Sequence, residues 1–256
     1  MKNSFEALLN IVKRLRHPET GCPWDKVQTN ETLVPNFIEE LYECIEAIDN
    51  KDYQHLSEEL GDLLLHIALQ IEISKENKHF DEKEVFQKII TKLISRHPHI
   101  FAEKEVNSVH QVKKNWELIK MEEKKHRESV LEGIPKAMPS LIVAQRTQEK
   151  AAAVGFDWPD LEPIFDKLQE ETDELHQAIA NQDNDNIQEE IGDLLFTIVN
   201  LSRKLGFDAD TALRISNEKF TDRFKKLEKH YKDNNKDLSL SDLAEMDSVW
   251  DKIKSQ

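Results

Sequence analysis

The stretch EELGDLL at residues 58–64 recurs as EEIGDLL at residues 189–195, which lie 131 positions further along the chain. The stretch EELYE at 39–43 recurs at the same spacing as EETDE at 170–174. Each half therefore carries two acidic segments, in the same order and at the same separation. Chance does not preserve order and separation together, so the sequence contains an internal duplication.

Further matches extend the duplication toward the end of each half. At a spacing of 127 positions the matched pairs are Lys92 with Lys219 and Arg96 with Arg223. The second half has therefore lost four residues, about one helical turn, after its second acidic segment. Gly133, Pro135 and Pro139 interrupt the chain between the halves and mark a linker. We expect two domains, 1–130 and 131–256, each long enough to bury its own core.

The composition and the spacing of apolar residues are typical of helices. The 256 residues include only 6 Gly and 8 Pro, whereas turn-rich β proteins need both in quantity. Apolar side chains fall at 37, 38, 41, 45 and 48, and again at 60, 63, 64, 67 and 71. Both spacings match one face of an α-helix. We expect an all-α fold in which two helices, joined by a turn, pack antiparallel through these stripes.

The charge and the cysteine content exclude several classes of protein. A formal charge of −15 repels a nucleic-acid backbone, so we expect no nucleic-acid partner. The longest apolar run, residues 63–73, is interrupted by polar side chains and is too short to span a membrane. Two cysteines without a CxxC motif are typical of free thiols in a reducing compartment. We expect a cytoplasmic protein without a membrane partner.

Pairs of carboxylates lie at the edges of the two predicted stripes. Each pair has the spacing i,i+3, which places both side chains on the same side of a helix. When two such helices pack antiparallel, the four carboxylates point to one shared spot beside the core. The predicted metal ligands are Glu40, Glu43, Glu59 and Asp62 in the first half and Glu171, Glu174, Glu190 and Asp193 in the second.

Basic residues are missing from these segments. No Lys or Arg lies between residues 168 and 202, against nine acidic residues, and none lies in 36–50 or 52–74. Four carboxylates beside an apolar core cannot all stay ionised unless a cation neutralises them. An oxygen-only site suits Mg²⁺ or Mn²⁺ far better than Zn²⁺. We therefore expect Mg²⁺ in each half, with Mn²⁺ as the alternative.

Two other metal centres fit the sequence less well. A di-iron carboxylate bundle needs Glu-x-x-His pairs, and the single such spacing, Glu123 to His126, lies in a charged run. His97 and His99 could form a zinc pair but lack partners at a useful spacing. We expect these two histidines to mark the end of a helix instead.

The acidic pattern, EExxE followed after fifteen residues by ExxD, resembles that of the MazG-type nucleoside triphosphate pyrophosphohydrolases, an all-α family. Further similar segments are GCPWD at 21–25, RHPH at 96–99, VGFDW at 154–158 and NEKF at 217–220. Two tandem units in one chain also occur in this family. The resemblance implies two MazG-type domains with four-helix-bundle-like cores that a homodimer completes, and a catalytic C-terminal unit.

The resemblance also implies a reaction and its residues. The enzyme would cleave NTPs and dNTPs, over a broad range of bases, to a nucleoside monophosphate and pyrophosphate with Mg²⁺. By resemblance the substrate-binding residues are Lys219, Arg223, Trp250, Lys254 and Lys120, and the first two also serve catalysis. Glu170 would orient the attacking water or lie in solvent beside the ligands. One departure is Asn186, because the family can carry a phosphate-binding lysine at that position.

Two other functions stay open at this point. One is a house-cleaning pyrophosphatase specific for a single nucleotide such as dUTP, and the other is a nucleotide-sensing module that binds a partner protein. The complete carboxylate sets and the Lys/Arg pairs favour the enzyme, because a scaffold needs neither.

Overall fold

The computed structural model describes residues 4–102, 108–123 and 128–255, and every regular element in these ranges is a helix. The prediction of an all-α fold is therefore confirmed. The chain divides into two compact units, Met1–Val106 and Asn107–Gln256. Among the described helices, none is long and apolar enough to cross a membrane.

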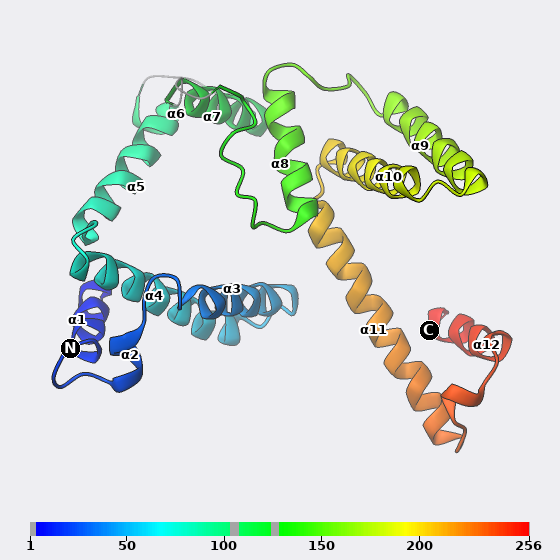
Figure 1. Ribbon diagram of the computed structural model, residues 1–256, viewed down its shortest axis with the longest axis horizontal. Helices are drawn as coiled ribbons and strands as arrows, with labels where there is room; N and C mark the ends of the chain where they lie inside the picture. The colour runs from blue at the N-terminus through cyan, green and yellow to red at the C-terminus, as the bar shows by residue number, and fades with distance from the viewer. Residues whose placement is uncertain (1–3, 103–107, 124–127, 256) are drawn as a thin grey trace. The chain divides into compact units, whose positions relative to one another are not determined.

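The first unit is built around two adjacent helices that lie side by side, α3 and α4 (Figure 1). Its helices are α1 (Phe5–Leu15), α2 (Pro23–Val27), α3 (Val34–Asp49), α4 (Tyr53–Glu76), α5 (Glu82–Arg96) and α6 (Pro98–Phe101). Helix α1 packs on α4, and its Val12 is buried together with Leu33, Leu69 and Ile73. This apolar cluster holds α1 and the start of α3 against the second half of α4.

The second unit repeats the central pair as α9 and α10. Its helices are α7 (Val109–Glu123), α8 (Ser140–Ala153), α9 (Glu162–Asn181), α10 (Asn184–Leu205), α11 (Ala209–Asp233), the 3₁₀ helix η1 (Leu238–Leu240) and α12 (Leu243–Lys254). Helix α8 packs on α10, and α12 packs on α11 through a cluster of Leu227, Tyr231 and Val249. Helix α7 contacts α8. The domain boundary between residues 130 and 131, which we infer from the sequence repeat, stays a prediction.

The duplication is also visible in the helix ends. Asp52 caps the start of α4 and Asp183 caps the start of α10, each by accepting a hydrogen bond from a backbone N–H three residues on. Helix α4 has 24 residues and α10 has 22. The connection that follows is also shorter in the second unit, at 206–208 against 77–81. The four lost residues are thus divided between a helix end and a loop.

Most residues of the apolar stripes of the paired helices are exposed in the described chain, although Ile71 is buried. Phe37, Ile38 and Leu41 of α3 and Leu60 and Leu64 of α4 are all exposed. The expectation that α3 and α4 pack through these stripes is therefore wrong. The buried residues of α3 are instead small ones, on a different line along the helix, and α10 leaves its own stripe exposed in the same way. Each helix pair forms a layer with an uncovered apolar face.

Candidate metal centres

Each central helix pair brings three of the predicted ligands together. Carboxylate oxygens of Glu40, Glu43 and Glu59, from α3 and α4, all lie within 4.8 Å of one another. We call these residues the first cluster. The second cluster, from α9 and α10, has the same geometry and consists of Glu171, Glu174 and Glu190. The helix spacing i,i+3 and the antiparallel pairing produce this convergence in both units.

The fourth predicted ligand of each set lies outside these tight groups but close enough to act on them. Burial raises the pKa of Glu40 to about 7, and Asp62, Glu43 and Glu59 add to the shift. Burial likewise raises the pKa of Glu190 above 4.5, and further contributions come from the second cluster and from Asp193. The acidic side chains therefore repel one another in both units, as the sequence predicts for clustered carboxylates.

A lysine neutralises part of the second cluster, contrary to the expectation that no basic residue is near. Lys167 Nζ lies 2.7 Å from Glu171 Oε1 and 2.8 Å from Glu170 Oε1. Hydrogen bonds to Glu170 and Glu171 raise the pKa of Lys167 above its usual 10.5. Lys167 comes one residue before the stretch 168–202, which lacks basic residues. The i,i+4 spacing of Lys167 and Glu171 on one helix predicts this ion pair.

Imidazoles accompany the first cluster. His55 Nε2 lies 2.8 Å from Glu59 Oε1, and His66 Nε2 lies 3.8 Å from Glu40 Oε1. His66 is buried, and burial lowers the pKa of its ring below 6.5 although Asp62 acts in the opposite direction. Sequence reasoning missed both histidines. The i,i+4 spacing of His55 and Glu59 on α4 was an available signal, whereas His66 meets Glu40 only when α3 and α4 are paired.

Buried oxygens without partners indicate that both clusters fit a cation. Glu59 is 6% exposed and Glu190 is 8% exposed, and Oε2 of each has no hydrogen-bond partner in the described chain. Buried polar atoms normally have partners, because a desolvated carboxylate without one is costly. A divalent cation bound by these oxygens would supply the missing interaction, and hard oxygen donors suit Mg²⁺.

The cations predicted to bind phosphate lie on a separate helix. Lys219 and Arg223 lie one turn apart on α11, and the ring of Phe220 between them stacks on Phe224. Trp250 of α12 packs on Phe220, with 5.2 Å between the ring centroids. Within the described ranges, no hydrogen bond or ion pair joins Lys219 or Arg223 to the second cluster.

The other predicted substrate contacts are also spread over the second unit. Lys254, at the end of α12, pairs with Asp251 at 3.0 Å. Lys120 lies on α7, which packs on α8. Among the described residues of the second unit, no hydrogen bond or ion pair connects the carboxylate cluster with the cations and aromatic rings of α11 and α12.

Residues 21–25 and 154–158, which contain Trp24 and Trp158, precede the two helix pairs. Charged side chains hold both segments through ion pairs and hydrogen bonds. In the second unit Asp157 pairs with Arg203 at 2.5 Å and with Lys204 at 3.0 Å, both near the end of α10. Burial alone would raise the pKa of Asp157, but the hydrogen bonds from Arg203 and Lys204 hold it below 3.8. In the first unit Arg16 pairs with Glu76 at the end of α4 and donates a hydrogen bond to the backbone oxygen of Asp25. These contacts fix each segment against a ligand-bearing helix.

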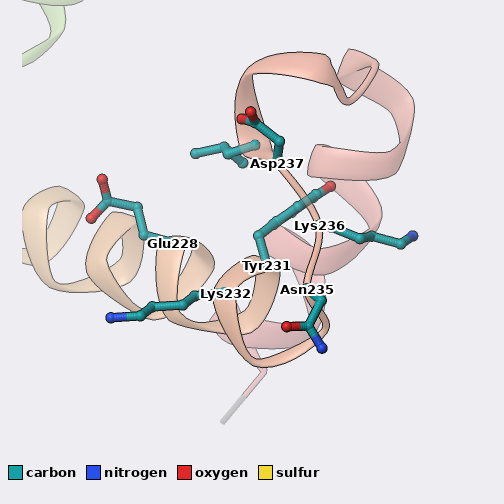
Figure 2. Close-up of a pocket in the computed structure, with 7 residues that line it drawn as sticks. Glu228, Tyr231, Lys232, Asn235, Lys236 and Asp237 are labelled. Atoms are coloured by element: carbon teal, nitrogen blue, oxygen red, sulfur yellow. The ribbon is translucent and has the colours of Figure 1, made fainter.

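One pocket of the second unit includes no residue of either cluster. A pocket of about 520 Å³ at the end of α11 is lined by residues such as Glu228, Tyr231 and Lys232, and none of the predicted site residues lines it (Figure 2).

His97 ends α5, as the sequence predicts. His126 lies outside the described residues, so the structure does not test whether it forms a di-iron motif with Glu123.

Comparison with known proteins agrees with this geometry. The sequence matches the MazG nucleotide pyrophosphohydrolase domain at residues 28–101 and again at 161–227, and each match contains one cluster. The chain is 42% identical over 260 residues to a nucleoside triphosphate pyrophosphohydrolase of Escherichia coli (strain K12), covering 99% of this chain and 98% of that protein. It is 43% identical over 251 residues to the nucleoside triphosphate pyrophosphohydrolase/pyrophosphatase MazG of Thermotoga maritima, covering 98% and 95%. With two domain matches and similarity along nearly its whole length, the chain belongs to the MazG family of nucleotide pyrophosphohydrolases.

Proposed function

We propose that this enzyme hydrolyses nucleoside triphosphates to nucleoside monophosphates and pyrophosphate at the second cluster. The observation that carries the proposal is the convergence of Glu171, Glu174 and Glu190, with a buried and unpartnered oxygen on Glu190, in a chain of this family. Asp193 joins these residues as the fourth ligand of Mg²⁺, with Mn²⁺ as the alternative. The expected substrates are NTPs and dNTPs over a broad range of bases.

The metal would polarise the phosphate and offset the negative charge that develops in the reaction. The carboxylates of the second cluster, which come from two paired helices, would hold this metal. Lys219 and Arg223 bind the phosphate chain through charge-assisted hydrogen bonds, and Trp250 and Lys254 contact the nucleotide, with a contribution from Lys120. Glu170 lies beside Glu171 and accepts a hydrogen bond from Lys167, and in this position its carboxylate would orient the attacking water molecule.

A homodimer is part of this proposal. The apolar stripes of both helix pairs are exposed, and faces of this kind normally mark an interaction surface. A second copy of the chain would cover them and complete four-helix cores. It would also bring phosphate-binding cations to the carboxylates, which no hydrogen bond or ion pair joins to Lys219 or Arg223 among the described residues of one chain. A cytoplasmic location and the absence of a nucleic-acid partner stay predictions.

Hydrolysis of ATP in ¹⁸O-labelled water tests the reaction. We expect AMP and pyrophosphate as products, with activity lost in excess chelator and restored by Mg²⁺. Label in free phosphate would indicate attack at the γ-phosphate and would contradict the proposal. Repeating the assay with each NTP and dNTP separates a broad enzyme from one restricted to dUTP, and the absence of turnover with all of them would favour a nucleotide-sensing module.

A further inference from the structure

The first cluster differs from the second in the side chains that border its carboxylates. His55 lies 2.8 Å from Glu59, and His66 lies 3.8 Å from Glu40, in both cases through Nε2. The positions 131 residues later are occupied by Asn and Thr, which offer no ring nitrogen. Two imidazole nitrogens thus border two of the predicted ligands in the first unit, and the corresponding positions of the second unit have none.

Buried polar atoms in the first cluster point to a missing ligand. The side chains of His66 and Glu59 are each 8% exposed. In the described part of the chain, Oε2 of Glu59 has no hydrogen-bond partner. The ring of His66 faces Glu40 through Nε2, and its other nitrogen, Nδ1, has no hydrogen-bond partner that would fix the tautomer. Glu59 is itself a member of the cluster. Its unpartnered oxygen is therefore part of a carboxylate that converges with those of Glu40 and Glu43. A bound cation would satisfy these oxygens and compensate for their burial.

The kind of donor decides which cation fits. Carboxylates alone favour Mg²⁺, Ca²⁺ or Mn²⁺, whereas imidazole favours the softer d-block cations such as Zn²⁺ or Fe²⁺. We propose that the first cluster binds a softer d-block divalent cation, such as Zn²⁺ or Fe²⁺, in preference to Mg²⁺, through the carboxylates of Glu40 and Glu59 and the imidazoles of His55 and His66. The inference shares with the proposed function only the premise that these clusters bind cations. It does not depend on catalysis at the second cluster.

Metal binding to the full chain, without nucleotide, tests this inference. Glu190→Gln with Asp193→Asn disables the second cluster, and equilibrium dialysis against Zn²⁺ or Mg²⁺ then reports on the first. Adding His55→Gln and His66→Gln should weaken Zn²⁺ binding by at least about 10-fold, the lower end of what loss of a supporting group costs a metal site. Mg²⁺ binding should stay the same, because all carboxylates of the first cluster are retained.

A matched control uses other imidazoles of the same unit. His17 and His79 are exposed, and replacing both with Gln should leave Zn²⁺ affinity unchanged if binding is specific to the cluster. Helix content measured by circular dichroism establishes that each variant is folded. Unchanged Zn²⁺ affinity in the His55/His66 variant would overturn the inference. An equal loss of Zn²⁺ and Mg²⁺ binding would overturn it too, since the imidazoles would then not select the cation.

The same measurements separate this inference from the proposed function. Zn²⁺ selection by a chain that releases no pyrophosphate from any nucleotide would contradict the proposed function alone. Pyrophosphate release by a chain whose first cluster does not distinguish Zn²⁺ from Mg²⁺ would contradict the inference alone.

Discussion

The two clusters occupy equivalent positions in duplicated helix pairs but have different neighbours. In the second cluster Lys167 donates to Glu171, whereas the corresponding position in the first unit is Asn36. In the first cluster His55 and His66 lie beside the carboxylates instead. The two copies therefore share their carboxylates and differ in the groups that balance the charge.

A third difference lies on the first helix of each pair. Cys44 of α3 is buried beside the first cluster, and burial together with the surrounding carboxylates raises the pKa of its thiol. The corresponding residue of α9 is Leu175. The surroundings of the first cluster thus offer softer donors, and those of the second offer a full positive charge. Because a triphosphate is an anion, we expect it to bind at the second cluster rather than at the first.

Disabling each cluster in turn gives the largest expected contrast. Glu190→Gln with Asp193→Asn removes two charged ligands while preserving side-chain shape. We expect ATP hydrolysis to fall by more than about 100-fold, since even groups that only support a metal ligand are worth about 10- to 100-fold. The matched variant, Glu59→Gln with Asp62→Asn, should retain most of the activity.

Initial rates of pyrophosphate release at saturating Mg²⁺ measure this contrast. Circular dichroism of both variants controls for loss of the fold. Equal losses of activity in the two variants would show that the halves are equivalent, and the assignment of catalysis to the second unit would then be wrong.

Much of this architecture could be predicted from the sequence because the signals are local. Helical periodicity and scarce Gly and Pro identify the helices, and the repeat of 131 positions pairs them in the same way twice. The i,i+3 spacing then brings Glu40 and Glu43 to one side of α3, and Glu59 of α4 meets them as expected. Convergence of the clusters follows from these regularities alone.

The features that were missed depend on what lies beyond one helix. Periodicity identifies an apolar face but not the molecule that covers it, so the exposure of Leu41 and Leu64 could not be foreseen. A count of basic residues within a segment overlooks a long side chain that reaches into it from outside, as Lys167 does. His66 gains its place beside Glu40 only when α3 and α4 are paired.

Removing the lysine of the second cluster should produce an intermediate effect on stability. We expect Lys167→Gln to lower the free energy of unfolding in chelator by about 1–3 kcal/mol, because the buried carboxylate of Glu171 loses its charged partner. Mg²⁺ should recover most of this loss, since a bound cation replaces the missing charge. Urea unfolding followed by circular dichroism, with and without Mg²⁺, measures both quantities.

A surface ion pair of the first unit provides the matched control for this effect. Lys88 pairs with Glu84 at 2.7 Å at the same i,i+4 distance in sequence, but both side chains are exposed. Lys88→Gln should therefore cost no more than about 1 kcal/mol and should not respond to Mg²⁺. If the two lysine variants behave alike, Lys167 does not serve to neutralise the second cluster.

The smallest expected effect is a pH dependence of the metal-free first cluster. The pKa of Glu40 is raised from 4.5 to about 7, first by burial and then by the neighbouring carboxylates. The folded state therefore binds this proton more tightly than the unfolded chain does. The resulting stabilisation is complete below the unfolded pKa of 4.5 and is lost as the pH rises through the folded value of about 7.

Thermal unfolding in chelator, at a series of pH values, measures this contribution. Between about pH 5 and pH 8 the wild-type midpoint should fall more steeply than that of Glu40→Gln, whose amide does not titrate in this range. Glu46→Gln, at an exposed carboxylate of the same helix, should keep the wild-type slope. Saturating a metal at the first cluster should flatten the wild-type curve, because a bound cation displaces the proton from Glu40. If Glu40→Gln and the wild type have the same slope, Glu40 is ionised in the folded protein without a cation, and the carboxylates of the first cluster are less strongly coupled than their separation of at most 4.8 Å implies.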